Sequence, residues 1–360
     1  MMETIASARS LEKDAGLSAL WIFWTGVYTA LTRNHYHPFL IAIAVLIAFP
    51  GAVWSQVVSS SLQNLSSDGY TLSVNANLVI LNATVLDRHN ALVSGLDKDD
   101  FQVYEDHVLQ PIKHFSHEDI PVTVGLVIDN SGSMAPKRAD VIAAALSFAR
   151  SSNPKDQMFL VNFNENVSFG LPTGIPFTDR PDQLQLGLSN INAIGETALY
   201  DAIAVALDHL KQGSCDKKVL ILISDGGDNA SKHNLAQVID KARHSGAIIY
   251  AIGIFDEQDG DQNPDVLKRF AKETGGEAFF PESSKEIVLI CERIAHDIRN
   301  QYTLAYIPII TKQDGVYRVI DVKVSSPGHG RLSARTRAGY FVPLMLPPQG
   351  IGTATHDSHN

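Results

Sequence analysis

Cysteine and charged side chains are scarce in this chain of 360 residues, in which charged residues make up 19%. Only two cysteines occur, Cys215 and Cys291. Two are too few for a disulfide framework, and their spacing fits no zinc motif. Whether they pair with each other stays open, although two free thiols are the commoner outcome. The net charge is −10, from 29 Lys and Arg against 39 Asp and Glu, which argues against a nucleic-acid partner.

The short motifs of several common enzyme classes are also missing. The sequence contains no G-x-S-x-G, no H-E-x-x-H, no G-x-x-x-x-G-K-[ST] and no Cys/His pair at ligand spacing. We therefore expect a protein that binds rather than an enzyme.

No apolar run reaches the roughly 18–20 residues that a membrane-spanning helix needs. Two uncharged apolar stretches, Leu17–Leu31 and Phe39–Trp54, nevertheless precede the polar part of the chain. The second is typical of the apolar core of a secretory signal. We predict that residues 1–56 are a signal or membrane segment that directs export. The pattern leaves open whether this segment is cleaved or stays as an anchor.

The rest of the sequence divides by its hydrophobic pattern. Residues 57–69 are rich in Ser, Asn and Gln and indicate a linker, whereas the Pro- and Gly-rich tail 343–360 indicates disorder. Residues 70–118 and 300–342 alternate apolar and polar positions between turns, which predicts antiparallel strands. We expect these two segments to be the first and second halves of one small β domain that is split by residues 120–299.

Residues 120–299 alternate apolar strands with amphipathic helices. Fully apolar strands in such an alternation predict a doubly wound α/β fold, with a mostly parallel sheet covered by helices on both faces. The expected strands are 122–128, 157–163, 167–169, 219–223, 247–254 and 278–280, and the expected helices are 139–150, 197–210, 234–244, 264–273 and 285–299.

Oxygen-bearing side chains follow the first of these strands. Asp129, Ser131 and Ser133 are spaced by two, at the strand end where doubly wound sheets bind ligands. Carboxylate and hydroxyl oxygens suit a hard cation such as Mg²⁺. The alternative is that the two serines cap the helix that follows.

Two further residues belong to the same predicted edge of the sheet. Thr197 opens the helix 197–210, and Asp225 follows the strand 219–223. Thr197 would otherwise cap its helix, and Asp225 would otherwise be a turn residue before two glycines. Glu196 and Asp201 are more simply interpreted as first-turn helix residues that the helix dipole stabilises.

These segments together resemble the von Willebrand factor type A domain and its metal-ion-dependent adhesion site. That site has the pattern D-x-S-x-S with a later Thr and a later Asp, and Asp129, Ser131, Ser133, Thr197 and Asp225 fill its five places. The surrounding V-I-D-N-S-G-S-M and L-I-L-I-S-D-G are similar to the family as well. The resemblance covers residues 121–299, and the flanking β segments resemble a bacterial group of related proteins.

The resemblance implies a bound Mg²⁺, with Mn²⁺ or Ca²⁺ as alternatives, that bridges to a Glu or Asp carboxylate of a partner protein. It implies an adhesion or recognition module outside the cytoplasm, associated with the membrane if the N-terminal segment remains. The alternatives are an assembly partner of a membrane or ATPase complex and, less favoured, a metal-dependent hydrolase. The acidic stretch Asp256–Asp265 departs from the calcium-loop pattern at Pro264 and Phe270, so we expect a solvated loop there.

Overall fold

A six-stranded sheet forms the centre of the α/β region. The computed structural model describes residues 78–189, 192–255, 262–310 and 315–343, all of which belong to one unit of the chain. The strand order is β10-β9-β8-β5-β6-β7, and every pairing is parallel except that of β7 with β6. The strands are β5 (Val122–Asp129), β6 (Gln157–Phe163), β7 (Val167–Phe169), β8 (Lys217–Ser224), β9 (Ile248–Gly253) and β10 (Ala278–Phe279).

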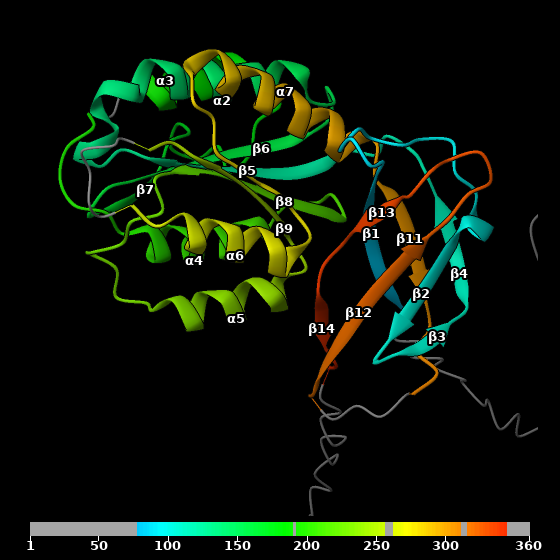
Figure 1. Ribbon diagram of the computed structural model, residues 1–360. Coiled ribbons are helices and arrows are strands. Elements are labelled where there is room, and N and C mark those ends of the chain that lie inside the picture. Colours follow the sequence, from blue (N-terminus) through cyan, green and yellow to red (C-terminus); the bar gives the residue numbers. More distant parts are fainter. Residues whose placement is uncertain (1–77, 190–191, 256–261, 311–314, 344–360) are drawn as a thin grey trace, which may run out of the picture. The chain divides into compact units, whose positions relative to one another are not determined.

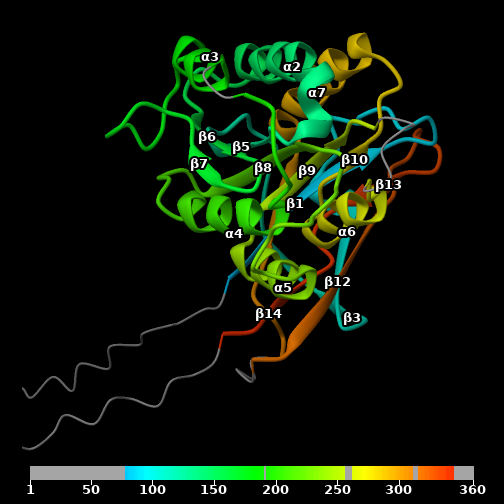
Figure 2. The ribbon, with the colours of Figure 1, turned by 90° about the vertical axis from the view of Figure 1, so that its left-hand side faces the viewer.

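Helices cover both faces of this sheet, as Figures 1 and 2 show. One face carries α2 (Arg138–Ser151), α3 (Pro181–Ser189) and α7 (Ser284–Arg299), and the other carries α4 (Leu199–Leu210), α5 (Leu235–Ser245) and α6 (Pro264–Thr274). Each layer has its own apolar core. Because all eight residues of β5 are buried, its continuous apolar run is explained by contact with both layers.

Close packing in the sheet depends on a glycine in the middle of β5. A Cβ placed on Gly125 would lie 2.4 Å from Cζ of Phe159 and 2.5 Å from Cδ2 of Leu220. Both neighbours are buried, so neither side chain has free space into which to move. The β5 backbone therefore approaches the neighbouring side chains more closely than any larger residue would permit.

Two four-stranded sheets form the β region, with orders β13-β1-β11-β4 and β14-β12-β2-β3. Both sheets contain strands from before and from after the α/β region, which pair where β1 lies antiparallel to β11 and where β2 lies antiparallel to β12. The strands are β1 (Val79–Leu86), β2 (Phe101–Glu105), β3 (Val108–Gln110), β4 (Ile112–Ser116), β11 (Tyr302–Tyr306), β12 (Tyr317–Val324), β13 (Ser333–Arg335) and β14 (Gly339–Phe341). The predicted fold class, a parallel α/β sheet with an additional antiparallel β region, is confirmed.

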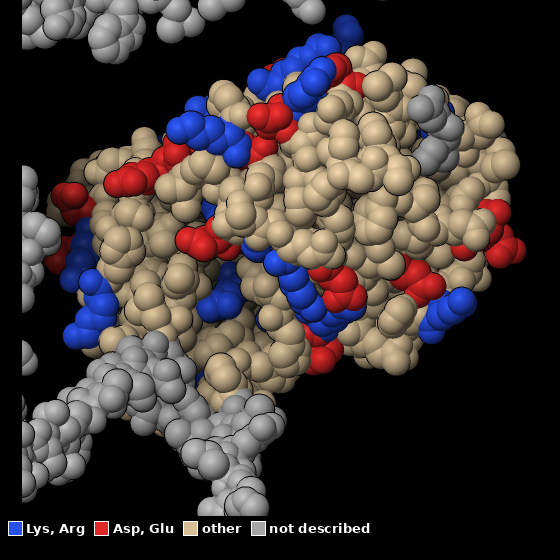
Figure 3. All heavy atoms as spheres, turned by 180° about the vertical axis from the view of Figure 1, so that it is seen from behind, with Lys and Arg blue, Asp and Glu red and all other residues tan. Residues whose placement is uncertain are grey.

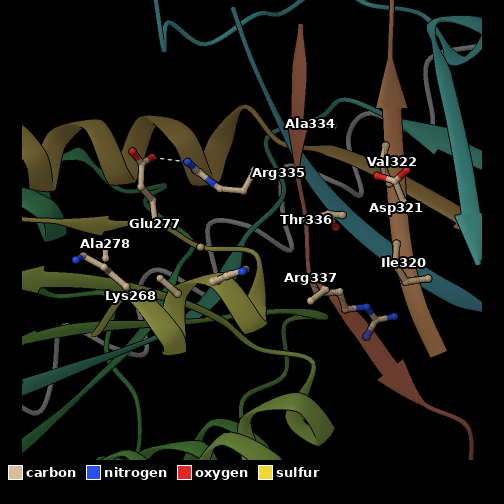
Figure 4. Close-up of a pocket in the computed structure, with 14 residues that line it drawn as sticks. Lys268, Glu277, Ala278, Ile320, Asp321, Val322, Ala334, Arg335, Thr336 and Arg337 are labelled. Carbon is tan, nitrogen blue, oxygen red and sulfur yellow. Dashed lines mark hydrogen bonds and ion pairs between the residues drawn. The ribbon is translucent and has the colours of Figure 1, made fainter. Parts of the chain in front are cut away.

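A buried carboxylate connects the α/β region to the β region. Asp297, near the end of α7, accepts hydrogen bonds from the Thr84 hydroxyl at 2.7 Å and the Tyr250 hydroxyl at 2.8 Å. It also forms an ion pair with Arg335, which reaches Glu277 as well (Figure 4). Glu277 and Arg335 line a cavity of about 490 Å³, to which α6, β12 and β13 also contribute residues.

Several details differ from the expectations. Helix α3 was not predicted, because its short sequence contains Gly187, where a Cβ would lie 2.2 Å from the Gly170 carbonyl oxygen. A 3₁₀ helix, η2 (Gly132–Lys137), precedes α2, and a second short one, η1 (Lys98–Asp100), precedes β2. Helix α4 begins at Leu199 rather than at Thr197.

Some of the expectations concern residues outside the described ranges. These are the N-terminal segment, the linker, residues 70–77 of the first β segment, the tail beyond 343 and most of the acidic stretch 256–265. Among the described residues, no helix has the length and apolar character needed to cross a bilayer. Cys215 and Cys291 are both free thiols, the first partly exposed and the second buried.

Candidate metal centre

The predicted site residues lie at the carboxyl ends of β5 and β8. These two strands are neighbours, and Ile128 is in register with Ile223. Asp129 is the last residue of β5, whereas Asp225 follows the end of β8 directly. The parallel pairing therefore brings two carboxylates that are far apart in the sequence to one edge of the sheet.

The hydroxyl groups of Ser131 and Ser133 point toward this edge and do not cap a helix. Ser131 occupies the N-cap position of η2, but its side chain makes no capping hydrogen bond. Its hydroxyl oxygen lies 3.2 Å from that of Ser133, which donates a hydrogen bond of 2.7 Å to Oδ2 of Asp225. Two polar groups that follow different strands are thus linked directly. The helix-capping alternative does not account for either hydroxyl.

Asp129 lies beneath the serines and is 2% exposed. Its Oδ1 accepts a hydrogen bond of 2.8 Å from the Ser131 backbone N–H, and its Oδ2 accepts one of 2.6 Å from the Ser224 hydroxyl. Burial raises the pKa of Asp129 to about 6, although the hydrogen bonds from Ser224 and Ser131 favour the ionised form. The carboxylate is held rigidly in an environment where a nearby positive charge would stabilise it.

Thr197 belongs to the loop before α4. The N-cap of α4 is Ala198, so Thr197 does not take the capping position that was its alternative interpretation. Asn229 holds the Thr197 backbone through two hydrogen bonds. The Asn229 side-chain Oδ1 accepts from the Thr197 N–H at 2.8 Å, and the Asn229 backbone N–H donates to the Thr197 carbonyl oxygen at 3.0 Å. The loop that carries Thr197 is therefore anchored to the segment that follows Asp225.

Four of the five predicted residues line one cavity of about 220 Å³, namely Ser131, Ser133, Thr197 and Asp225. Asp129 does not line this cavity, but its carboxylate accepts a hydrogen bond from the backbone N–H of Ser131, which does. Asp225 also stabilises the turn before the two glycines, which was the alternative interpretation of this residue. Its Oδ1 accepts a hydrogen bond of 3.0 Å from the Gly227 N–H, while its Oδ2 accepts one from the Ser133 hydroxyl. The two roles use different oxygens.

One interpretation of neighbouring residues was wrong. Glu196 lies before α4, is exposed and lines the cavity, so it is not a first-turn helix residue. Asp201 is in the first turn, as expected. It also accepts hydrogen bonds from the backbone N–H groups of Lys232 and His233, which ties α4 to the loop before α5.

Sequence reasoning missed two residues that position the site, Ser224 and Asn229. Ser224 orients Asp129, and Asn229 holds Thr197. Ser224 was visible only as the residue before Asp225, and Asn229 only as one polar residue in a polar loop. Both roles depend on pairing with a distant segment, so no local pattern indicates them.

The donor set fits a hard divalent cation. The predicted site residues that line the cavity offer only oxygen atoms: the hydroxyl groups of two serines and one threonine, and the carboxylate of Asp225. The carboxylate of Asp129 lies behind them. Within the described ranges no cluster of three or more His, Cys, Asp or Glu is placed to hold a metal. A site with two carboxylates would therefore rely on hydroxyl groups and water to complete six oxygen ligands.

A search of curated proteins gives no match. A von Willebrand factor type A protein from Catenulispora acidiphila has 12% identity and a TM-score of 0.45, with 74% of this chain and 73% of that chain covered. The von Willebrand factor domain of the type V pili tip protein Mfa5 from Porphyromonas gingivalis has 16% identity and a TM-score of 0.43, with 50% and 95% covered. BatB from Bacteroides thetaiotaomicron has 16% identity and a TM-score of 0.37, with 49% and 98% covered.

The family model that matches this chain is that of the von Willebrand factor type A domain, over residues 123–292. The matched range runs from the second residue of β5 into α7 and contains all five predicted site residues. Residues 123–292 of this chain are therefore a von Willebrand factor type A domain.

Proposed function

We propose that this protein binds a partner protein outside the cytoplasm through a divalent cation held by Asp129, Ser131, Ser133, Thr197 and Asp225. The observation that carries the proposal is the hydrogen-bonded series from Ser131 through Ser133 to Asp225, at the cavity that Thr197 also lines. Hydroxyl groups and carboxylates from three separate segments meet there, and helix capping explains none of the three hydroxyls.

Such a site would leave a coordination position of the cation open to an anionic oxygen. Two carboxylates balance the charge of a divalent cation, and the hydroxyl ligands add none. A bound cation would supply an electrophilic centre at the floor of the cavity for one anionic oxygen of the partner, such as a Glu or Asp carboxylate. The chain's own part is to hold the oxygen ligands in place, and Ser224 and Asn229 do this for Asp129 and Thr197.

Binding rather than catalysis is the role we assign to this site, because von Willebrand factor type A domains are in general interaction modules. No histidine or cysteine is among the residues that line the cavity. The apolar stretches before residue 56 support a location outside the cytoplasm, and Mg²⁺ is the cation that we propose, with Mn²⁺ or Ca²⁺ as alternatives.

Thermal unfolding of the full chain in increasing Mg²⁺ or Mn²⁺ tests the cation site. A ligand that binds only the folded state adds about 2.7 kcal/mol at 100 times its dissociation constant. We expect this increment for the parent chain and none for Asp225→Asn, which keeps the side-chain size and removes one charge. Asp216→Asn is the matched control, because Asp216 is exposed and precedes the opposite end of β8.

Each variant is compared with itself in the presence of a chelator, so that changes in intrinsic stability cancel. Equal increments for the parent and Asp225→Asn would refute a cation at this position. Absence of an increment in the parent, over concentrations that span the millimolar range of weak sites, would remove the basis for cation-bridged binding.

A further inference from the structure

Exposed aliphatic side chains gather at one end of the β region. Of the fourteen large apolar side chains that are exposed in the described ranges, nine belong to the β region. Each of these nine is at least 37% exposed. Six of them define what we call the apolar end: Leu78, Ile80, Val108, Ile307, Ile309 and Val319.

Strand pairing brings the first part of the apolar end together. The first pair between β1 and β11 is Val79 with Tyr306. Leu78 and Ile307 are the residues next to this pair, and they therefore lie side by side. Ile80 belongs to the same end of β1.

The second sheet ends at the same place. The backbone N–H of Asp106, in the turn between β2 and β3, donates to the Val319 carbonyl oxygen at 2.9 Å, and Val108 follows that turn. The loop after β11 connects the two sheets, because the Ile309 N–H donates to Oε1 of Gln110 at 3.0 Å. Figure 1 shows β3, β14 and the start of β12 at this end of the β region.

Charged side chains are few in the described segments that form the apolar end. Asp106 forms an ion pair with Arg318 at 3.5 Å. Glu105 is 2% exposed, and its carboxylate accepts hydrogen bonds from two tyrosine hydroxyls. The next charged residues along β12, Asp321 and Lys323, have opposite signs. Figure 3 shows mainly uncharged surface on the part of the β region just above the grey atoms. An apolar medium at this end would therefore not bury an unpaired carboxylate of the described segments.

The path of the chain indicates what covers this surface. Leu78 is the first described residue, so the N-terminal segment joins the β region at the apolar end. That segment contains the uncharged apolar stretch Phe39–Trp54, which is predicted to direct the chain to a membrane. Residues 55–77, which lie between the two, can span at most about 80 Å. The apolar end is therefore the part of the described structure that is nearest along the chain to the predicted membrane segment.

The composition of the apolar end suits lipid better than protein. Surfaces that bind other proteins tightly are enriched in Trp, Tyr, Phe, Met and Arg. The nine exposed apolar side chains of the β region are all Leu, Ile or Val. Removal of aliphatic surface from water is favourable in any apolar medium, and a fluid bilayer needs no matching shape.

We propose that the apolar end rests on a lipid bilayer, the membrane to which the N-terminal segment is predicted to direct the chain. This contact does not depend on the proposed cation site. Asp129 and Asp225 lie at the carboxyl ends of β5 and β8, whereas the β region adjoins the other end of β5, since only five residues separate β4 from β5. A bilayer at the apolar end therefore leaves the cation site accessible to a partner.

Fluorescence of the full chain in nanodiscs of phosphatidylcholine and phosphatidylglycerol tests the contact. A fluorescent probe is attached at Ile309→Cys, after Cys215→Ser removes the partly exposed natural thiol; Cys291 is buried. We expect lipid that carries a doxyl group to quench this probe, and aqueous iodide not to reach it. A probe at Leu186→Cys on α3, where the side chain is 57% exposed, should show the reverse pattern.

A second set of variants carries the probe at Ile309 and changes the surface around it. In Val108→Ser/Val319→Ser, quenching by the doxyl lipid should fall, because less aliphatic surface remains to enter the bilayer. Leu186→Ser/Leu289→Ser is the matched control, since it removes two exposed aliphatic side chains from α3 and α7 and should leave the quenching as in the parent. Thermal unfolding is measured for every variant, and the single variants Val108→Ser and Val319→Ser serve if the double variant folds poorly.

Three results overturn the inference. The first is a chain that does not associate with the nanodiscs, or a probe at Ile309 that iodide quenches and the doxyl lipid does not. The second is a probe that is shielded from iodide but not quenched by the doxyl lipid, which would show that a second copy or another part of the chain covers the apolar end. The third is unchanged doxyl quenching in Val108→Ser/Val319→Ser, which would show that these side chains do not make the contact.

Discussion

Lys217, at the start of β8, is a buried cation whose effect on stability is set by pH. The residue is 6% exposed, and its ammonium donates a hydrogen bond to the Ile298 carbonyl oxygen at the end of α7. Burial lowers the pKa of Lys217 from 10.5 to about 8, although Asp297 and other nearby carboxylates oppose the shift. The perturbation that we consider is Lys217→Met, which keeps the length of the side chain and removes the charge.

The sign of the pH dependence follows from this lowered pKa. Between pH 8 and 10.5 the unfolded chain keeps the Lys217 proton that the folded chain releases, so stability rises with pH. Below pH 8 the full penalty is present. The 2.5-unit difference between 10.5 and 8 corresponds to about 3 kcal/mol at neutral pH, of which about 2.5 kcal/mol is recovered by pH 10.

Urea unfolding of the parent and of Lys217→Met at a series of pH values between 7 and 10 measures the effect. The free energy of unfolding of the parent should rise relative to that of the variant by about 2.5 kcal/mol over this range. The variant also leaves the Ile298 carbonyl without its donor, which shifts the whole difference by an amount that does not depend on pH. A difference that stays constant between pH 7 and 10 would show that Lys217 is not buried as a cation.

Three further predictions concern packing, the junction and the thiols. Asp297→Asn should lower the free energy of unfolding by about 3 kcal/mol, because it leaves Arg335 without the charge of its buried partner. Denaturant unfolding measures this, and a loss under 1 kcal/mol would contradict it. Gly125→Ala should cost about 1–3 kcal/mol, because the new Cβ would lie 2.4 Å from the Phe159 ring, whereas Gly330→Ala, with no atom within 4 Å, should cost little. A thiol reagent at pH 8 should label Cys215 alone in the native chain, because Cys291 is buried with its pKa raised to about 12; two labelled thiols before unfolding would refute the burial.

The sequence predicted the elements best where a strand is buried on both faces. β6 has the predicted bounds, and β5 and β8 extend the predicted strands by one to three residues. The reason is that a strand covered by helices on both sides needs an unbroken apolar run, and such a run is visible in the sequence. The sequence of α3 has no comparable apolar pattern, because Gly187 interrupts it. A glycine is needed there because the helix lies close to the Gly170 carbonyl oxygen.

The candidate site shows the same division between local and tertiary information. The spacing of Asp129, Ser131 and Ser133 is local, and strand order explains how Asp225 comes to lie beside them. The supports, Ser224 and Asn229, were not predictable, because each acts on a residue that lies more than thirty positions away or on another strand. The predicted start of helix α4 was two residues too early, so Glu196 was assigned to the first turn of the helix and its position at the cavity was missed.

The residues at the two ends of β8 make different contacts, and the length of the strand separates them. Lys217, at the first residue, contacts the end of α7, while Ser224, at the last, orients Asp129. Eight residues at about 3.3 Å per residue separate these ends by roughly 25 Å, well beyond the 7–10 Å within which substitutions usually affect each other. The buried charges at the junction are therefore expected to act on stability without changing the proposed oxygen ligands at the other end.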